Sequence, residues 1–145
     1  NSSVRISGIH THDKVIEGEK MNFLLRQKDT TQFKEISNAI ITRLINETKA
    51  EVKNQSKIVV WSEISTLILD KDEDSLMNIF RTLAKEENIY LLTNPFSIGT
   101  NGFISENKIL FFSPNGELVS KHIKYGGNFM EGTLEGNKTI NTNAT

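Results

Sequence analysis

The chain has 145 residues, a length that suits one domain, and its 37% hydrophobic and 24% charged residues are typical of globular domains. Its formal net charge is −1, and its basic residues are scattered rather than gathered in a stripe with interleaved aromatic residues. We therefore expect no nucleic-acid partner. Cysteine is absent, which excludes disulfides and thiolate metal sites. No run approaches 18 apolar residues, so none of these residues is expected to span a membrane.

The first half of the chain predicts a strand, a loop and a long helix. Apolar residues alternate with small or polar ones over residues 4–9, which indicates a strand. Residues 14–28 show no clean period, and we expect a loop with a short helical turn at residues 21–25. Asp29 precedes Gln32 by three residues, the spacing of a capping box at a helix start. The apolar stripe of this helix would consist of Phe33, Ile36, Ile40, Ile41, Leu44, Ile45 and either Ala50 or Val52.

A second strand and a second helix follow. Residues 58–60 form a wholly apolar run that ends at Trp61, and this pattern predicts a parallel strand covered on both faces. Acidic residues at positions 70–74 then precede an amphipathic helix over residues 74–86. Acids at a helix start complement the helix dipole, so this cluster is explained without a metal ion.

The second half of the chain predicts a third strand and a hairpin. The strand covers residues 89–93 and ends before Pro95, and the hairpin strands cover residues 109–112 and 118–122. The turn between them is Ser113-Pro114-Asn115-Gly116, with Pro and Gly at positions that a type I turn favours. The order β-α-β-α-β followed by a hairpin predicts an α/β fold with a mixed sheet and helices packed on it.

A carboxylate stands directly after the second predicted strand. Glu63 closes the tripeptide Trp61-Ser62-Glu63, and ligands in open α/β sheets bind at the carboxyl ends of strands. A glutamate at that position is a candidate general base. Taken alone, it is more simply explained as a helix cap or a solvated loop acid. Lys124, at the end of the hairpin, is by itself equally ordinary, since most lysines face solvent.

The hairpin resembles that of the carbon–nitrogen hydrolase (nitrilase) superfamily. Asn107, Pro114 and Gly116 match its N-x-x-x-x-x-x-P-x-G pattern, and Lys124 stands eight residues after the glycine, where that family has a lysine. The tripeptide that ends at Glu63 is similar to the family's Trp-Pro-Glu or Phe-Pro-Glu, with Ser in place of Pro. The tryptophan version is most similar to the nitrilase domain of apolipoprotein N-acyltransferases. The resemblance extends from about residue 4 through a tail that begins at Glu131.

The resemblance implies a fold and a set of roles. The fold would be part of an α-β-β-α sandwich, with residues 1–145 a partial domain that ends before the nucleophile strand. Glu63 would be the general base and Lys124 the oxyanion stabiliser, with Lys121 as a competitor for that register. Glu131 matches, within one residue, a second glutamate often found near the lysine. The family's nucleophile is a cysteine, which by the resemblance would lie shortly after Thr145.

The implied chemistry is acyl transfer through a thioester, without a cofactor or a metal ion. The first hypothesis is transfer of a fatty acyl group, as in apolipoprotein N-acyltransferases, from a phospholipid donor to the N-terminal amine of a lipoprotein. That reaction would occur on the extracytoplasmic face of a membrane, reached through segments outside this chain. The alternative is a soluble amidase or nitrilase that hydrolyses a C–N bond, cytoplasmic and homodimeric. A non-catalytic pseudo-enzyme or interaction half-domain is a further alternative, because the chain has no cysteine.

Two expectations remain. The string His10, His12 and Asp13 places possible ligands at alternate positions, as in a metal-dependent hydrolase, but no further ligands stand out and we interpret these histidines as loop residues. A half-sandwich would also expose a sheet face that its missing half should cover, so we expect marginal stability or self-association of the isolated chain.

Overall fold

The structure is a computed structural model that describes residues 2–10, 20–21, 23–63, 65–99, 104–124 and 141–142. Within these ranges it has short helical stretches at residues 20–21 and 23–26, two long helices and one eight-stranded mixed sheet. None of the described helices is both long and apolar enough to cross a membrane. The elements are β1 (Ile6–Ile9), α2 (Thr30–Lys53), β2 (Ile58–Trp61), β3 (Thr66–Leu69), a 3₁₀ turn (Asp70–Asp72), α3 (Glu73–Glu86), β4 (Tyr90–Thr93), β5 (Pro95–Ile98), β6 (Ile104–Phe112), β7 (Leu118–Ile123) and β8 (Asn141–Thr142).

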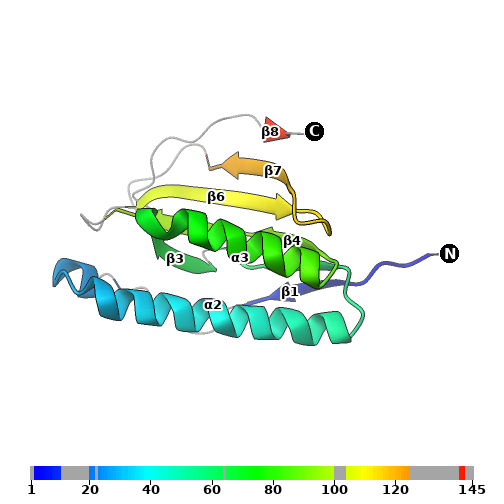
Figure 1. The fold of residues 1–145 in the computed structure, drawn as a ribbon, viewed down its shortest axis with the longest axis horizontal. Coiled ribbons are helices and arrows are strands. Elements are labelled where there is room, and N and C mark those ends of the chain that lie inside the picture. Colours follow the sequence, from blue (N-terminus) through cyan, green and yellow to red (C-terminus); the bar gives the residue numbers. More distant parts are fainter. Residues whose placement is uncertain are drawn as a thin grey trace.

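The sheet is built around the long strand β6. Strands β1, β2 and β4 are parallel neighbours, and β4 and β5 both pair antiparallel with β6, one along each half of its length. Strand β3 pairs parallel with β5, and the hairpin strand β7 pairs antiparallel with β6. Both long helices lie on the same side of this sheet (Figure 1). The predicted α/β fold with a mixed sheet and packed helices is therefore confirmed.

Two neighbouring strands are interrupted at the same level of the sheet. The chain leaves β2 at Ser62 and re-enters as β3, and it leaves β4 at Asn94 and re-enters as β5. A hydrogen bond connects the two interruptions, since the Ser65 backbone N–H donates to the Asn94 carbonyl at 3.2 Å. Glu63 lies at the first interruption, between the end of β2 and the start of β3.

The sequence pattern missed both continuations. β3 was not predicted, and β5 begins at Pro95, the residue that was expected to stop the third strand. Proline is tolerated as the first residue of a strand because its missing N–H need not join the ladder. All four residues of β5 are buried.

Helix α2 packs on the sheet through polar as well as apolar residues. The Asp29 side chain accepts a hydrogen bond from the Gln32 N–H at 3.0 Å, as the capping pattern predicted. Two buried residues lie outside the predicted stripe: the Ser37 hydroxyl donates to the Leu67 carbonyl, and Thr48 accepts from the indole N–H of Trp61 at 2.9 Å. Ala50, one candidate for the end of the stripe, is exposed.

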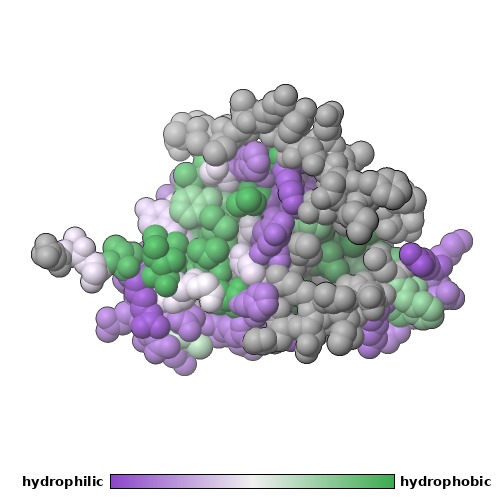
Figure 2. Space-filling model, turned by 180° about the vertical axis from the view of Figure 1, so that it is seen from behind, coloured by the Kyte–Doolittle hydropathy of each residue, from purple (hydrophilic) through white to green (hydrophobic). Residues whose placement is uncertain are grey.

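The other face of the sheet is partly exposed along β1, β2, β4 and the second half of β6. Strand β2 was expected to be covered on both faces, yet Val59 and Trp61 are buried towards the helices while Ile58 and Val60 are only half-buried. Figure 2 shows hydrophobic side chains gathered on this side. Pairing and alternation along the strands place on it Ile6, Ile58, Val60, Tyr90, Leu92, Ile109 and Phe111, of which Ile6 is 62% exposed and Tyr90 and Ile109 are each 40% exposed.

This exposed face predicts that the isolated chain self-associates, because contiguous apolar surface of this kind marks an interaction site or an aggregation liability. Replacing Ile6 and Ile109 together by lysine should raise the apparent dissociation constant at least about tenfold, since each buried isoleucine contributes about 1.5–3 kcal/mol. Sedimentation at several concentrations measures this. Ile79→Lys, at a 36% exposed residue of α3, is the control and should change nothing.

The β6–β7 turn depends on one glycine. Gly116 has φ +83°, and its N–H donates to the Ser113 carbonyl at 2.9 Å, which closes the predicted four-residue turn. A Cβ at this position would lie 2.9 Å from the Arg81 carbonyl oxygen, a backbone atom of α3.

We therefore expect Gly116→Ala to lower the free energy of unfolding by about 1–3 kcal/mol, through the left-handed φ and the contact with α3. Urea unfolding measures the effect. The paired control is Asn115→Ala in the same turn, which has no left-handed φ and should cost less. Equal losses for the two variants would contradict this account of the turn.

Candidate functional site

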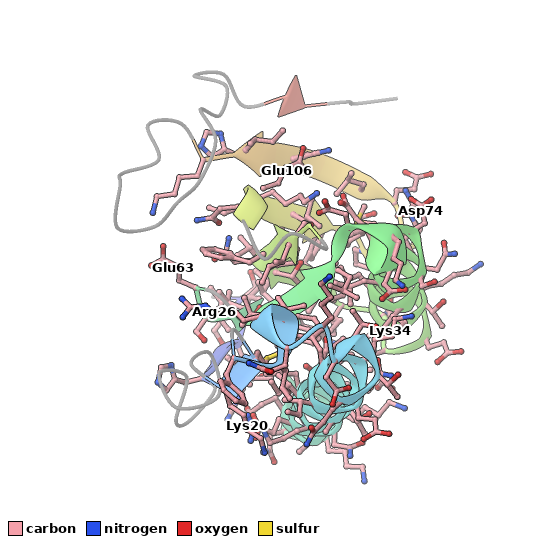
Figure 3. The ribbon with its side chains drawn as sticks, turned by 90° about the vertical axis from the view of Figure 1, so that its left-hand side faces the viewer. Lys20, Arg26, Lys34, Glu63, Asp74 and Glu106 are labelled. Carbon is pink, nitrogen blue, oxygen red and sulfur yellow. The ribbon has the colours of Figure 1, made fainter. Side chains whose placement is uncertain are left out.

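Glu63 and Lys124 meet although 61 residues separate them in the sequence. The Lys124 Nζ lies 3.4 Å from the Glu63 Oε1. Glu63 projects from the interruption after β2, on the side of the sheet away from the helices (Figure 3). Its side chain is 65% exposed and that of Lys124 is 37% exposed, so a pair of this kind contributes at most about 1 kcal/mol to stability.

The β6–β7 ladder orients Lys124. Its backbone N–H donates to the Asn107 carbonyl at 2.9 Å, which extends the pairing one residue beyond Ile123. Lys108, on β6, points to the helix side, where it forms ion pairs with Glu73 of α3 and with Glu106. Because successive residues of a strand alternate faces, Asn107 and Lys124 must share the opposite face, the one on which Glu63 lies.

Lys121, the alternative candidate for the lysine of the motif, does not lie on the face of the sheet that carries Glu63. Lys121 pairs with Leu110, which is 1% exposed and faces the helices. Lys121 therefore belongs to the opposite face of the sheet from Lys124. Glu131, the third residue that the resemblance singled out, lies outside the described residues, as do His12 and Asp13.

Asn94 links the interruption after β4 to the strand that carries Asn107. Its Nδ2 donates to the Lys108 carbonyl at 2.8 Å and to the Asn107 Oδ1 at 2.9 Å. Asn94 is 5% exposed and Asn107 is 3% exposed, so both amides are fixed in the sheet. The sequence analysis did not single out Asn94. Its position directly after a parallel strand, at the same level as Glu63, was the available signal.

Two open pockets lie elsewhere. They occupy the groove between α2 and α3, with volumes of about 140 and 330 Å³, and Ile79 lines both. The exposed ion pair between Lys34 and Asp72, at 3.1 Å, connects the two helices there. Neither pocket contains a residue that the sequence singled out for chemistry, and both lie on the helix side of the sheet, away from Glu63 and Lys124.

Comparisons with known proteins agree on the fold. The structure is similar to that of a carbon–nitrogen hydrolase from Helicobacter pylori G27, with a TM-score of 0.57 and 17% identity over 68% of this chain and 38% of that one. It is also similar to the C. elegans NitFhit protein, with a TM-score of 0.59 and 14% identity over 73% of this chain and 32% of that one. The chain thus spans about a third of the length of these proteins. No family model and no curated protein matches it.

These likenesses define the class of fold. The mixed sheet with two helices on one face is a nitrilase-like α/β arrangement, as the sequence predicted. At 14–17% identity the likeness concerns the fold alone. The chemistry has to be argued from the residues that the fold brings together.

Proposed function

We propose that this chain supplies the general base and the oxyanion-stabilising cation of a carbon–nitrogen hydrolase-type acyl transfer. The observation that carries the proposal is the contact between Glu63 and Lys124, which is made within a nitrilase-like fold and by the two residues that the sequence motifs had singled out.

The reaction would proceed in two balanced steps. The Glu63 carboxylate takes the proton of a cysteine thiol, and the sulfur attacks the acyl carbon while the Lys124 ammonium stabilises the negative charge on the acyl oxygen. The bond from the acyl carbon to its leaving group breaks, and the leaving group takes the proton from Glu63. An amine or a water molecule then attacks the thioester while Glu63 takes its proton, the C–S bond breaks, and the sulfur receives that proton from Glu63 and leaves as the thiol. The thiol has to come from outside these 145 residues, which contain no cysteine.

Two versions of the reaction differ in donor and acceptor. Transfer of a fatty acyl group from a phospholipid to a lipoprotein N-terminal amine is favoured by the Trp61-Ser62-Glu63 tripeptide, which is similar to that of apolipoprotein N-acyltransferases. Hydrolysis of a small amide is favoured by the likeness to the Helicobacter carbon–nitrogen hydrolase. Membrane attachment belongs to the first version, and a soluble homodimer to the second.

The test uses the complete protein that contains this chain. It is incubated either with short aliphatic amides, with ammonia release as the readout, or with phospholipid vesicles and a diacylated lipopeptide, with acylation of the peptide amine as the readout. Activity in either arm that a thiol-alkylating reagent abolishes supports the proposal and selects its version. Activity in neither arm favours the non-catalytic interpretation, and activity that alkylation leaves intact contradicts a reaction through a cysteine thioester.

A further inference from the structure

Two buried polar atoms beside Lys124 have no hydrogen-bond partner among the described residues. They are the Nδ2 of Asn107 and the Nδ1 of His122. Asn107 is 3% exposed, and a buried amide or imidazole nitrogen without a partner has lost its hydration without gaining a hydrogen bond in return. Such atoms at native sites call for a specific explanation, and a ligand is one that is testable.

The hydrogen bonds fix which atom of Asn107 is the unpartnered one. The Asn94 Nδ2 donates to the Lys108 carbonyl, so this atom must be the nitrogen of its amide. Its second proton goes to the Asn107 side chain, which must therefore present its oxygen there. The Asn107 Nδ2, with two protons to donate, is left as the group without a partner among the described residues.

Strand pairing places the two side chains on one face, around Lys124. His122 pairs with Ile109, and Asn107 is two residues before Ile109 on β6, so the two are diagonal neighbours on the face that carries Lys124. Diagonal neighbours lie about 7–8 Å apart, so one small group can contact both side chains. The Lys124 N–H to Asn107 carbonyl bond, at 2.9 Å, places the lysine directly opposite Asn107.

We propose that Asn107 and His122, the latter with a proton on Nδ1, form a polar subsite beside Lys124, in which their nitrogen atoms donate to an oxygen of a small carboxylic acid or amide. This subsite rests on the proposed function. It adds that the oxygen-bearing end of the acyl compound binds next to the Glu63–Lys124 pair. Three donors around one oxygen would satisfy the two buried nitrogen atoms and would match a carboxylate or a carboxamide.

The first readout is binding rather than activity. The complete protein, labelled with ¹⁵N at asparagine and histidine, is titrated in separate experiments with acetate and with acetamide. We expect saturable shifts of the Asn107 side-chain amide and of the His122 imidazole, larger with acetate if the subsite takes a carboxylate and larger with acetamide if it takes an amide. Absence of a shift at both residues with both probes would overturn the proposal.

Variants separate the donors from their structural surroundings. Asn107→Asp keeps an oxygen for Asn94 and removes the donor, and His122→Phe keeps a ring of similar size without nitrogen. Each should weaken binding of the preferred probe at least about tenfold, the loss expected for one hydrogen bond to such a group. The controls are Asn78→Leu on the exposed face of α3 and His10→Phe after β1, and both should bind like the unmodified protein. Unchanged binding in Asn107→Asp and His122→Phe would contradict the assignment.

Failure of the subsite and failure of the proposed function give different results. If the complete protein forms a thiol-dependent acyl adduct while neither resonance moves, the acyl-transfer proposal stands and the subsite is wrong. If both resonances move and the adduct never forms, the subsite is a binding site and the acyl-transfer proposal is wrong.

Discussion

Replacing Glu63 by glutamine in the complete protein is expected to lower kcat/KM for acyl transfer by about 10²–10⁴, the contribution of a positioned general base. The stability should stay nearly unchanged, because the Glu63 side chain is 65% exposed and its pair with Lys124 is a surface pair. Lys124→Gln should lower kcat/KM by about 10²–10³, as the loss of one oxyanion donor does. Steady-state kinetics and thermal unfolding of the same preparations measure both effects.

One control for these variants lies on β7, the strand that precedes Lys124, and the other lies on α3. Lys121→Gln removes a lysine three residues away on the opposite face of β7, and Glu86→Gln removes an exposed acid near the end of α3. Both should retain activity. Because Glu63 and Lys124 act on one reaction, the double variant should lose less than the product of the two single losses. Loss of activity in Lys121→Gln instead would mean that the register of the site is wrong.

The largest expected loss of stability lies on the other face of the sheet. Lys108 is 1% exposed and forms ion pairs with Glu73, at the first turn of α3, and with Glu106. Replacing both glutamates by glutamine would leave a buried ammonium without a counter-charge, which typically costs about 3–5 kcal/mol. Lys108→Met should cost less, since the two glutamates are 30% and 38% exposed and water can solvate them.

Chemical unfolding of the three proteins measures this asymmetry. The matched control is Lys34→Met, which breaks the exposed pair with Asp72 between α2 and α3 and should cost at most about 1 kcal/mol. If Lys108→Met were at least as destabilising as the double glutamine variant, packing of the lysine stem rather than its charge would be what β6 requires.

Hydrophobic periodicity and the capping and turn residues were enough to predict the main helices and strands. Asp29 with Gln32 located the start of α2, and the apolar run from Ile58 matched β2 at both ends. The strands β3 and β5 are not predictable from local pattern because each is a four-residue continuation beyond an interruption, and a proline such as Pro95 usually marks the end of a strand. A local pattern does not indicate that two interrupted strands lie side by side.

The burial of certain polar residues was also not predictable from the sequence. Thr48 is fully buried because the Trp61 indole donates to it, and Lys108 occupies a core position of β6 because two carboxylates surround it. In the sequence both appear as ordinary polar residues. Their burial depends on partners that are distant along the chain, and those partners are visible only once the helices are placed on the sheet.

The pairing of Glu63 with Lys124 was reached through family motifs rather than through local physics. Glu63 alone was ordinary as a loop acid, and Lys124 alone as a strand-end lysine. The structure adds the contact at 3.4 Å and the buried, hydrogen-bonded amides of Asn94 and Asn107.

The most direct measurement of the central claim is the mass of the complete protein after brief mixing with an acyl substrate and acid quenching. The account predicts a thioester adduct of one acyl group on a cysteine, formed by the unmodified protein and by Lys121→Gln, and reduced at least about 10²-fold in rate in Glu63→Gln and Lys124→Gln. Turnover of the substrate without any adduct, or an adduct that forms equally fast in all four proteins, would contradict it.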